Sequence, residues 1–274
     1  MRNLDMDKVA RLIAAVGADV ILPRFRALQD HEVMEKGLGD IVTAADLEAE
    51  ERLTTELPAL LPGSLVVGEE AHHVDPTITA RFAGDAPVWV IDPLDGTRNF
   101  SKGSTTFCML VALVQNQTPR MAWLVDPSTG RIAMAEEGGG ATLDGTPMKT
   151  GPGPALDEMV GQLNLNWYAS ADRAAVRAAT EKRFGTIHRL QCAGHDFFMQ
   201  SQGLRHFSFY RRLWPWDHAV GVLMRRESGG VVGRIDDAPY RAGDRVEGLL
   251  SAPDPDSWQE IRTFIRTAAP ANPS

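Results

Sequence analysis

The chain has 274 residues, of which 43% are hydrophobic and 23% charged, a composition typical of globular proteins with a sizeable core. Its formal net charge of −8 argues against electrostatic binding to nucleic acid or anionic lipid, and neither is expected as a partner. The longest apolar run, Phe107 to Val114, is far shorter than the roughly 20 residues that span a bilayer. Because the N-terminus also lacks a secretory signal, we expect a cytoplasmic location.

The N-terminal region predicts two helices with a glycine-punctuated segment between them. Apolar residues from Val9 to Val20 have the spacing of an amphipathic helix, which Pro23 ends or bends. Lys36 to Val42 has the glycines of a hairpin, and a second helix opens at Thr43-Ala44-Ala45-Asp46. Since Thr43 and Asp46 have the spacing of a capping box, helix capping alone would explain Asp46.

Two apolar runs are each followed at once by carboxylates. Leu65 to Gly68 leads into Glu69-Glu70, and Val88 to Ile91 leads into Asp92. Acidic residues that follow separate strands can meet at one edge of a sheet, where ligands commonly bind. The adjoining pair His72-His73 is interpreted as part of a solvated loop.

The turn after Ile91 carries the strongest chemical signal. Pro93 ends the strand ladder and the Asp95-Gly96 step forms a polar turn, so that Asp92 and Asp95 are brought close together. Neighbouring carboxylates repel unless a cation lies between them, and oxygen ligands without Cys or His favour Mg²⁺ or Mn²⁺. Amides around Gly96 and Thr97 can hold an anion, so a phosphate substrate is indicated. The alternative is an ordinary turn in which the aspartates only cap and solvate the loop.

The remainder of the chain predicts an antiparallel meander over Thr105 to Glu137, a hairpin at Thr142 to Gly145, and then an α/β half. A Gly- and Pro-rich stretch at Gly151 to Pro154 suggests a boundary between residues 1–150, an α+β half with most metal ligands, and residues 151–274, with the substrate side. Asp254 and Pro255 supply the N-cap and first residue of the last helix.

Three further residues carry chemistry that the sequence leaves open. Cys108 and Cys192 lie far apart, without another Cys or a His at metal-ligand spacing, and are interpreted as reduced packing residues. Asp217 falls in the first turn of a helix that ends near Glu227, where the helix dipole alone would favour it. The alternative is that Asp217 joins Asp92 and Asp95 as a further metal ligand.

Taken together, these motifs resemble the inositol monophosphatase family of Mg²⁺-dependent, lithium-sensitive phosphatases. The resemblance covers essentially the whole chain, in the family's order: Gly68-Glu69-Glu70, then Asp92-Pro93-Leu94-Asp95-Gly96-Thr97 with Asn99-Phe100, then Trp216-Asp217 with Ala219, Gly221, Glu227, Gly229 and Gly230. It implies a mixed α+β and α/β chain in layered α/β/α/β/α form, as in fructose-1,6-bisphosphatase. It also implies a homodimer.

The resemblance assigns roles to single residues. Metal ligands map onto Glu69, Asp92, the Leu94 carbonyl, Asp95 and Asp217, for about two to three Mg²⁺ ions per site. The amides of Gly96 and Thr97 would hold the phosphate, and Asp46 with Thr97 would orient the attacking water, with Lys36 and Asp40 nearby. The expected catalytic group is therefore Asp46, Glu69, Asp92 and Thr97.

The implied reaction is in-line attack of metal-activated water on a phosphate ester, without a phosphoenzyme. Aspartate-nucleophile phosphatases of the haloacid dehalogenase type need Asp-x-Asp, which differs from the Asp92-x-x-Asp95 spacing found here. A covalent aspartyl phosphate is thereby disfavoured.

The substrate side departs from the family pattern. Animal members contact inositol through an acidic residue and a histidine, and this chain has Tyr210 and Trp214 at those places. Ala193 fits a family substrate position. Arg98 and the pair Arg211-Arg212 would favour another anion or a polar alcohol, although solvated surface is the preferred interpretation of the pair. Inositol 1-phosphate is the nominal substrate, with histidinol phosphate as the runner-up and fructose 1,6-bisphosphate or nucleotide 3′-phosphates as further alternatives. A regulatory or binding protein with the same fold is the alternative from another class.

Overall fold

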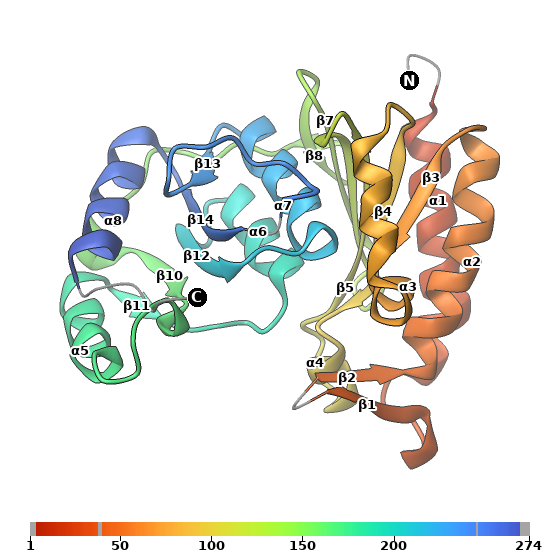
Figure 1. Ribbon diagram of the computed structural model, residues 1–274, viewed down its shortest axis with the longest axis horizontal. Helices are drawn as coiled ribbons and strands as arrows, with labels where there is room; N and C mark the ends of the chain where they lie inside the picture. Colours follow the sequence, from red (N-terminus) through yellow and green to blue (C-terminus); the bar gives the residue numbers. More distant parts are fainter. Residues whose placement is uncertain (1–3, 38–39, 245, 269–274) are drawn as a thin grey trace.

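Eight α-helices and three β-sheets make up the part of the chain that the computed structural model describes, residues 4–37, 40–244 and 246–268 (Figure 1). The helices are α1 Met6–Val16, α2 Ala44–Leu60, α3 Glu69–Val74, α4 Thr97–Ser101, α5 Arg173–Arg183, α6 Ala193–Ser201, α7 Pro215–Glu227 and α8 Pro255–Thr267. A short two-stranded sheet pairs β1 Val33–Gly37 with β2 Asp40–Thr43 in antiparallel fashion.

The two large sheets use different parts of the chain. Seven strands follow one another in chain order in the first sheet, where only β3 and β4 are parallel: β3 Leu65–Gly68, β4 Val88–Asp95, β5 Cys108–Gln115, β6 Thr118–Asp126, β7 Arg131–Glu136, β8 Gly140–Leu143 and β9 Thr146–Pro147. The second sheet has the order β11-β10-β12-β14-β13, with β10 Val160–Leu163, β11 Thr186–Ile187, β12 Phe207–Arg212, β13 Val231–Arg234 and β14 Glu247–Ala252.

Helices and sheets alternate in five layers, which confirms the predicted α/β/α/β/α arrangement (Figure 1). Helices α1 and α2 pack on one face of the seven-stranded sheet, where Trp89 and Ile91 of β4 belong to their apolar cluster. Val88 and Val90 face the other way and pack with α6 and α7. The same two helices also pack on the five-stranded sheet, whose far face is covered by α5 and α8.

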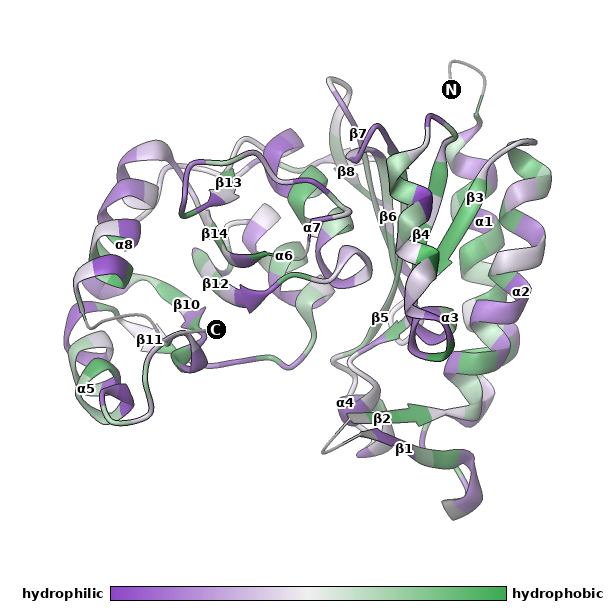
Figure 2. Cartoon of the chain, in the orientation of Figure 1, coloured by the Kyte–Doolittle hydropathy of each residue, from purple (hydrophilic) through white to green (hydrophobic). Residues whose placement is uncertain are grey.

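Hydropathy explains this layering. The strands of the seven-stranded sheet are mostly hydrophobic, whereas the outer helices α1, α2, α5 and α8 carry hydrophilic residues between their apolar ones (Figure 2). Every residue of β4 is buried, as expected for a strand covered by helices on both faces. Across the described residues, no helix is both long and apolar enough to cross a lipid bilayer.

Most local predictions are confirmed. The meander over β5 to β7, the β8–β9 hairpin and the N-cap of α8 by Asp254, which accepts from the Ser257 amide, are all present. The β1–β2 pair forms the predicted hairpin, although its residues 38 and 39 lie outside the described residues. Beyond α1 the helix widens into a π turn at Gly17–Ile21 and then tightens into a 3₁₀ turn at Leu22–Arg24, which contains Pro23.

Two local predictions were wrong. Strand β4 does not end at Pro93 but continues to Asp95, because a bulge absorbs the proline. The pair His72-His73 lies in helix α3 and not in a loop, and His72 is buried, with its ring centroid 4.9 Å from that of Trp216. An aromatic neighbour from a distant segment therefore covers His72, which local polarity alone does not reveal.

Candidate active site

Three carboxylates converge at the end of strands β3 and β4. These neighbouring strands are parallel, so Glu69, which follows β3, and Asp92, near the end of β4, lie at the same edge of the sheet. Asp217 reaches them from the first turn of α7. One oxygen from each of the three carboxylates lies within 4.8 Å of the others.

The bulge in β4 determines how Asp92 and Asp95 are presented. Asp92 pairs with Leu110 and Asp95 pairs with Cys108, so β4 has one more residue in this interval than β5. An extra residue changes the alternation of side chains, and Asp95 is therefore not forced to the face opposite Asp92. The amide of Leu94 donates to Asp92 Oδ1 at 3.0 Å.

Asp95 lies beside the three-carboxylate group without belonging to it. Its Oδ2 accepts from the amide of Gly194 at the start of α6, and Cys192 Sγ lies 3.2 Å from the same oxygen. Asp95 therefore links β4 to α6.

The clustered carboxylates strongly disfavour each other's charge. Burial, followed by the carboxylates of Glu69, Asp95 and Asp217, raises the pKa of Asp92 well above its ordinary value. Lys36 offsets part of this charge, since its Nζ lies 3.1 Å from Glu69 Oε1 and also contacts Glu70. Burial opposes the charge of Lys36, but the carboxylates of Glu69 and Glu70 raise its pKa overall. A divalent cation is the group that such a carboxylate cluster fits.

Asp46 is both a helix cap and a neighbour of the site. Its Oδ2 accepts from the amide of Thr43 at 2.8 Å, as the capping box predicts. Its Oδ1 lies 3.0 Å from the hydroxyl of Thr97, which is also 2.9 Å from the Leu94 carbonyl oxygen. Burial raises the pKa of Asp46 to about 6.

A buried pair of glutamates, Glu50 and Glu70, supports Glu69. Sequence analysis named Glu70 beside Glu69 without a role of its own, and it did not name Glu50. Glu50 on α2 accepts from the amides of Glu70 and Ala71 at 2.9 and 2.7 Å, which holds the start of α3. Gly68 makes room for it, because a Cβ there would lie 2.3 Å from the Glu50 carboxyl carbon. Burial raises the pKa of Glu50 to about 7 and that of Glu70 to about 8.

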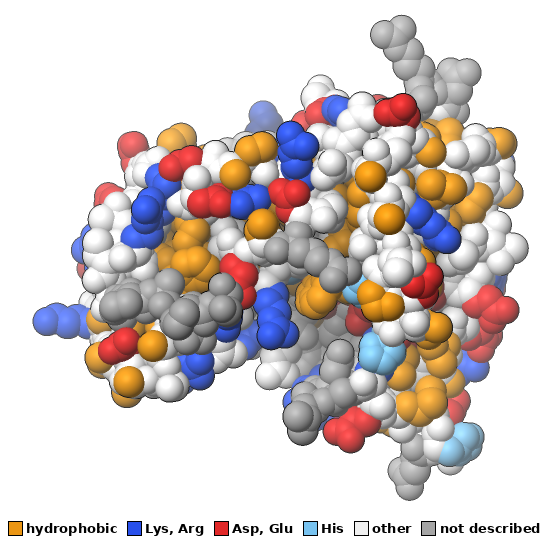
Figure 3. Space-filling model, viewed as in Figure 1, with side chains coloured by type: hydrophobic (Ala, Val, Ile, Leu, Met, Phe, Trp, Pro, Cys, Tyr) orange, Lys and Arg blue, Asp and Glu red, His pale blue; other side chains and the backbone are white. Residues whose placement is uncertain are grey.

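Two adjoining cavities open onto this edge of the sheet. The smaller, about 310 Å³, is lined by Glu69, Asp92, Leu94, Asp95, Gly96, Thr97, Arg98 and Asp217, among others. The larger, about 660 Å³, is lined by Ala193, Tyr210 and Trp214. Asp95, Arg189, Gln191 and Asp217 line both, so the cavities share a wall. The surface is hollowed between the two large sheets, and basic side chains face the hollow (Figure 3).

The predicted substrate-side residues occupy distinct places. Tyr210 donates from its hydroxyl to the buried Asp196 at 2.8 Å, and its ring stacks on Phe197. Trp214 stacks on Trp216, with ring centroids 5.2 Å apart. Ala193 is the first residue of α6, and Arg98 is exposed in α4 at the rim of the smaller cavity. The structure therefore places Ala193, Tyr210 and Trp214 in one cavity and Arg98 in the other.

Sequence reasoning foresaw the arginines of the larger cavity only in part, because it weighed the pair Arg211-Arg212 as an anion-binding feature and did not name Arg173 or Arg189. Arg173, Arg189, Arg211 and Arg212 all line the larger cavity. Arg211 is half-buried, with its Nε 2.8 Å from Glu247, which contradicts its interpretation as solvated surface. The four arginines lie on three segments of the C-terminal half, because Arg211 and Arg212 are neighbours in β12, and no local motif could have grouped that pair with Arg173 and Arg189.

The two cysteines are free and buried, as predicted, but they are not isolated packing residues. Their sulfurs lie 3.8 Å apart, and each also lies within 4 Å of Asp95 Oδ2. His195, three residues after Cys192, completes a group whose potential ligand atoms lie within 4.8 Å of one another. This spacing is visible in the sequence, so the conclusion that neither cysteine has a nearby histidine was wrong.

An acidic cluster at the edge of a layered α/β fold, beside a polar cavity, is the arrangement of a hydrolase that uses divalent cations. Comparison with known proteins makes the class specific. The family described as "Inositol monophosphatase family" matches residues 3–266. The chain belongs to this family, as the motifs predicted. Since its members are metal-dependent phosphatases, typically with Mg²⁺, the protein is a phosphoric monoester hydrolase.

Individual relatives agree with this assignment. The fructose-1,6-bisphosphatase/inositol-1-monophosphatase of Aquifex aeolicus is 26% identical over 244 residues, which cover 88% of this chain and 89% of that protein. The inositol-1-monophosphatase of Rhizobium meliloti is 31% identical over 209 residues, which cover 75% of this chain and 76% of the relative. Among solved structures, the IMPase of Thermotoga maritima has a TM-score of 0.80 at 24% identity, over 96% of this chain and 97% of that one.

Proposed function

We propose that the protein hydrolyses a small-molecule phosphate monoester with Mg²⁺ held by Glu69, Asp92, Asp95, Asp217 and the carbonyl of Leu94. The observation that carries the proposal is the convergence of Glu69, Asp92 and Asp217, whose oxygens lie within 4.8 Å of one another. Their all-oxygen chemistry suits a hard divalent cation, and the raised pKa of Asp92 shows that charge there needs compensation. We expect about two to three ions per site.

Bound divalent cations supply the positive charge that activates water and stabilises the leaving oxygen. The chain's own residues position the reactants. Asp46, held by Thr43, accepts from the Thr97 hydroxyl, so that this pair can orient the attacking water. The backbone at Gly96 and Thr97 borders the smaller cavity and would hold the phosphate. Glu69 and Asp92 complete the catalytic group.

The larger cavity would hold the alcohol part of the substrate. Ala193, Tyr210 and Trp214 line it, whereas Arg98 lines the smaller cavity. Inositol 1-phosphate remains the nominal substrate, because a polar cavity of about 660 Å³ accommodates a ring of that size. We further propose that the protein is a cytoplasmic homodimer that is inhibited by Li⁺.

A second candidate substrate class is favoured by the arginines. Arg173, Arg189, Arg211 and Arg212 give the larger cavity a basic wall, and arginine is well suited to bind a further phosphate or carboxylate. Fructose 1,6-bisphosphate has such a second anion, whereas inositol 1-phosphate does not. Histidinol phosphate and nucleotide 3′-phosphates remain alternatives, as does a regulatory role that uses the same fold.

Phosphate release from these esters tests the proposal directly. The panel contains inositol 1-phosphate, histidinol phosphate, fructose 1,6-bisphosphate and adenosine 3′,5′-bisphosphate, each with Mg²⁺, with a chelator, and with added Li⁺. Mg²⁺-dependent release from one ester supports the phosphatase and identifies its substrate class. If no ester is hydrolysed while Mg²⁺ still raises the melting temperature, the regulatory role is favoured instead.

A single substitution tests whether the basic wall of the larger cavity binds a second anion. In the variant Arg212→Gln, which changes a residue that lines the larger cavity and not the smaller one, KM for fructose 1,6-bisphosphate should rise by at least about tenfold, while KM for inositol 1-phosphate changes little, since only the former presents a second anion. Arg183→Gln, at the exposed end of α5, serves as the matched control. Equal effects on both esters would contradict a second anion site.

A further inference from the structure

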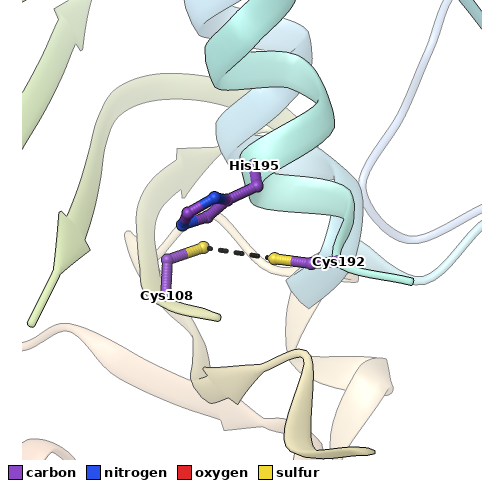
Figure 4. Close-up of side chains that lie close together, drawn as sticks. All are labelled: Cys108, Cys192 and His195. Atoms are coloured by element: carbon purple, nitrogen blue, oxygen red, sulfur yellow. Dashed lines mark hydrogen bonds between the residues drawn. The ribbon is translucent and has the colours of Figure 1, made fainter. Parts of the chain in front are cut away.

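A compact group of thiols lies where strand β5 meets the start of helix α6 (Figure 4). Cys108 projects from β5 and Cys192 precedes α6, and their sulfurs are 3.8 Å apart. The imidazole of His195, in the first turn of α6, lies beside both (Figure 4). Two sulfurs and an imidazole thus occupy one small volume.

A carboxylate completes the group. Asp95 Oδ2 lies 3.2 Å from Cys192 Sγ and 3.9 Å from Cys108 Sγ. The potential ligand atoms of Cys108, Cys192 and His195 lie within 4.8 Å of one another, and the Asp95 carboxylate contacts the two sulfurs from beside this group. The topology explains why they meet, because Asp95 pairs with Cys108 across β4 and β5 and also accepts from the amide of Gly194 in α6.

The spacing of these atoms matches tetrahedral coordination. Two thiolates bound to Zn²⁺ at about 2.3 Å, with tetrahedral angles between them, lie about 3.8 Å apart. The two cysteine sulfurs have this separation. The sulfur–oxygen distances of 3.2 and 3.9 Å bracket the value of about 3.5 Å that a bound thiolate and carboxylate would have.

The imidazole of His195 has a nitrogen atom that is available to bind a metal ion. Its Nε2 is buried and has no hydrogen-bond partner among the described residues, with the Asp126 carboxylate 3.6 Å away. Cys192 and Asp95 line the larger cavity, so one side of the group borders the substrate side. Gly194 leaves space for the thiols, because a Cβ there would lie 2.4 Å from Cys108 Sγ.

We propose that Cys108, Cys192 and His195, with Asp95 as the fourth ligand, bind a thiophilic divalent cation such as Zn²⁺ or Cd²⁺. Binding displaces the thiol protons, which pass to solvent. The site differs in chemistry from the oxygen-only Mg²⁺ site, because thiolates select soft ions and carboxylates select hard ones. It is therefore a second metal site of the same chain.

Asp95 couples the two sites. Asp95 Oδ2 already faces the two sulfurs, so a thiophilic cation bound there would compete with Mg²⁺ for the Asp95 carboxylate, and occupation of the thiol site inhibits hydrolysis. This consequence rests on the proposed function, whereas the thiol site itself does not. The two are tested by separate measurements.

Titration of the reduced protein with Cd²⁺ tests the site optically. Cadmium bound to thiolates absorbs in the ultraviolet, and we expect this band to saturate at one Cd²⁺ per chain, with or without Mg²⁺. Cys108→Ser and Cys192→Ser should each lose most of the band. His195→Gln keeps both thiols and should weaken binding by at least about tenfold, since even outer partners of metal ligands contribute that much.

The controls separate ligand loss from misfolding and surface binding. Circular dichroism checks that each serine variant is folded. His31→Gln removes an exposed histidine that is distant in sequence from the thiol group, and this variant should bind Cd²⁺ as the wild type does. Absence of the band in wild-type protein, or wild-type affinity in His195→Gln and the serine variants, would overturn the proposal. Because the readout is optical, this result stands even if no ester on the panel is hydrolysed.

Activity then tests the coupling. With saturating Mg²⁺, one equivalent of Cd²⁺ should abolish hydrolysis of whichever ester is a substrate, and the residual activity of Cys192→Ser should resist Cd²⁺ by at least about tenfold. Full activity of the wild type with the optical band saturated would show that Asp95 is not shared, which overturns the inhibition and leaves the thiol site standing.

Discussion

Asp92 is the residue on which the repulsion within the site converges, since it is buried and faces the carboxylates of Glu69, Asp95 and Asp217. Replacement by asparagine keeps its volume and removes its charge. Asp92→Asn should lower kcat by at least about 100-fold, the size of loss seen when one electrostatic stabiliser is removed. Without metal the variant should melt at or above the wild-type temperature, because a repulsive charge is gone.

The two readouts for Asp92→Asn separate catalysis from stability. Addition of Mg²⁺ should raise the melting temperature of the wild type and leave that of the variant nearly unchanged, since binding to the folded state is what stabilises it. Asp157→Asn, on an exposed residue, is the matched control and should behave as the wild type. An active Asp92→Asn enzyme would refute the proposed metal role of this residue.

Substitution of Trp214 tests which residues determine substrate preference. The Trp214 indole stacks on Trp216 and lines the larger cavity together with Asp217, but it offers no ligand atom for a hard cation. Trp214→His should therefore change the ratios of kcat/KM among the substrates on the panel by about tenfold, since a changed contact of this kind contributes roughly 1–3 kcal/mol. The Mg²⁺ requirement should stay the same. Trp167→His, which disturbs an aromatic contact with Phe209, controls for general loss of packing. Unchanged ratios would place the alcohol pocket elsewhere.

At the scale of single residues, the sequence predicts contacts that are local or that follow from strand direction. Asp92 and Asp95 share one turn, and Glu69 joins Asp92 because both follow neighbouring parallel strands. Cys108 and Asp95 meet only through the register of β4 on β5, which depends on a bulge. The arginines of the larger cavity come from three segments, and their meeting depends on how the second sheet is assembled.

Helix α7 is the element whose packing is most constrained, because it lies between both large sheets and carries Asp217. Gly221 allows this, since a Cβ there would lie 2.1 Å from the ring of the buried Phe197 on α6. Alanine normally favours a helix over glycine by about 1 kcal/mol. Here the clash should reverse the sign, and Gly221→Ala should lower stability by about 1–3 kcal/mol.

Displacement of α7 should also move Asp217 away from Glu69 and Asp92. Denaturant unfolding of Gly221→Ala measures the stability loss, and Mg²⁺ titration of the melting temperature measures the effect on the site. Gly84→Ala is the matched control, because the nearest atom to its Cβ would be 3.8 Å away. Equal or greater stability of Gly221→Ala would mean that α6 and α7 repack freely around the new methyl group.

Whole elements were easier to predict than the contacts between them. Capping signals such as Asp254 with Pro255, and turn residues between β5, β6 and β7, act within a few residues and are therefore visible in the sequence. The continuation of β4 through Pro93 was missed because a bulge lets a proline remain in a central strand. The burial of His72 was missed because Trp214 and Trp216, which cover it, come from a distant segment.

For the molecule as a whole, the buried acids make stability depend on pH. Burial raises the pKa of Glu50 to about 7 and of Glu70 to about 8, so the folded protein holds protons that the unfolded chain has already released. Stability then falls as pH rises through this range. Burial also lowers the pKa of His218 to about 4, an opposing effect that is confined to pH values below its ordinary pKa of 6.5.

In the range from about pH 6.5 to about pH 8 the glutamates act without the opposing effect of His218, and Asp92, whose pKa is also raised, acts in the same direction as they do. In the presence of a chelator, the melting temperature should fall as pH rises across this range, and Glu70→Gln should flatten the slope because one of the two groups no longer titrates. Mg²⁺ competes with protons for neighbouring carboxylates, so its stabilising effect should be larger at the upper end of the range. Scanning calorimetry at several pH values, with and without Mg²⁺, measures both trends. A melting temperature that rises with pH in the chelator would show that Lys36 and the backbone amides already keep these glutamates charged in the folded protein.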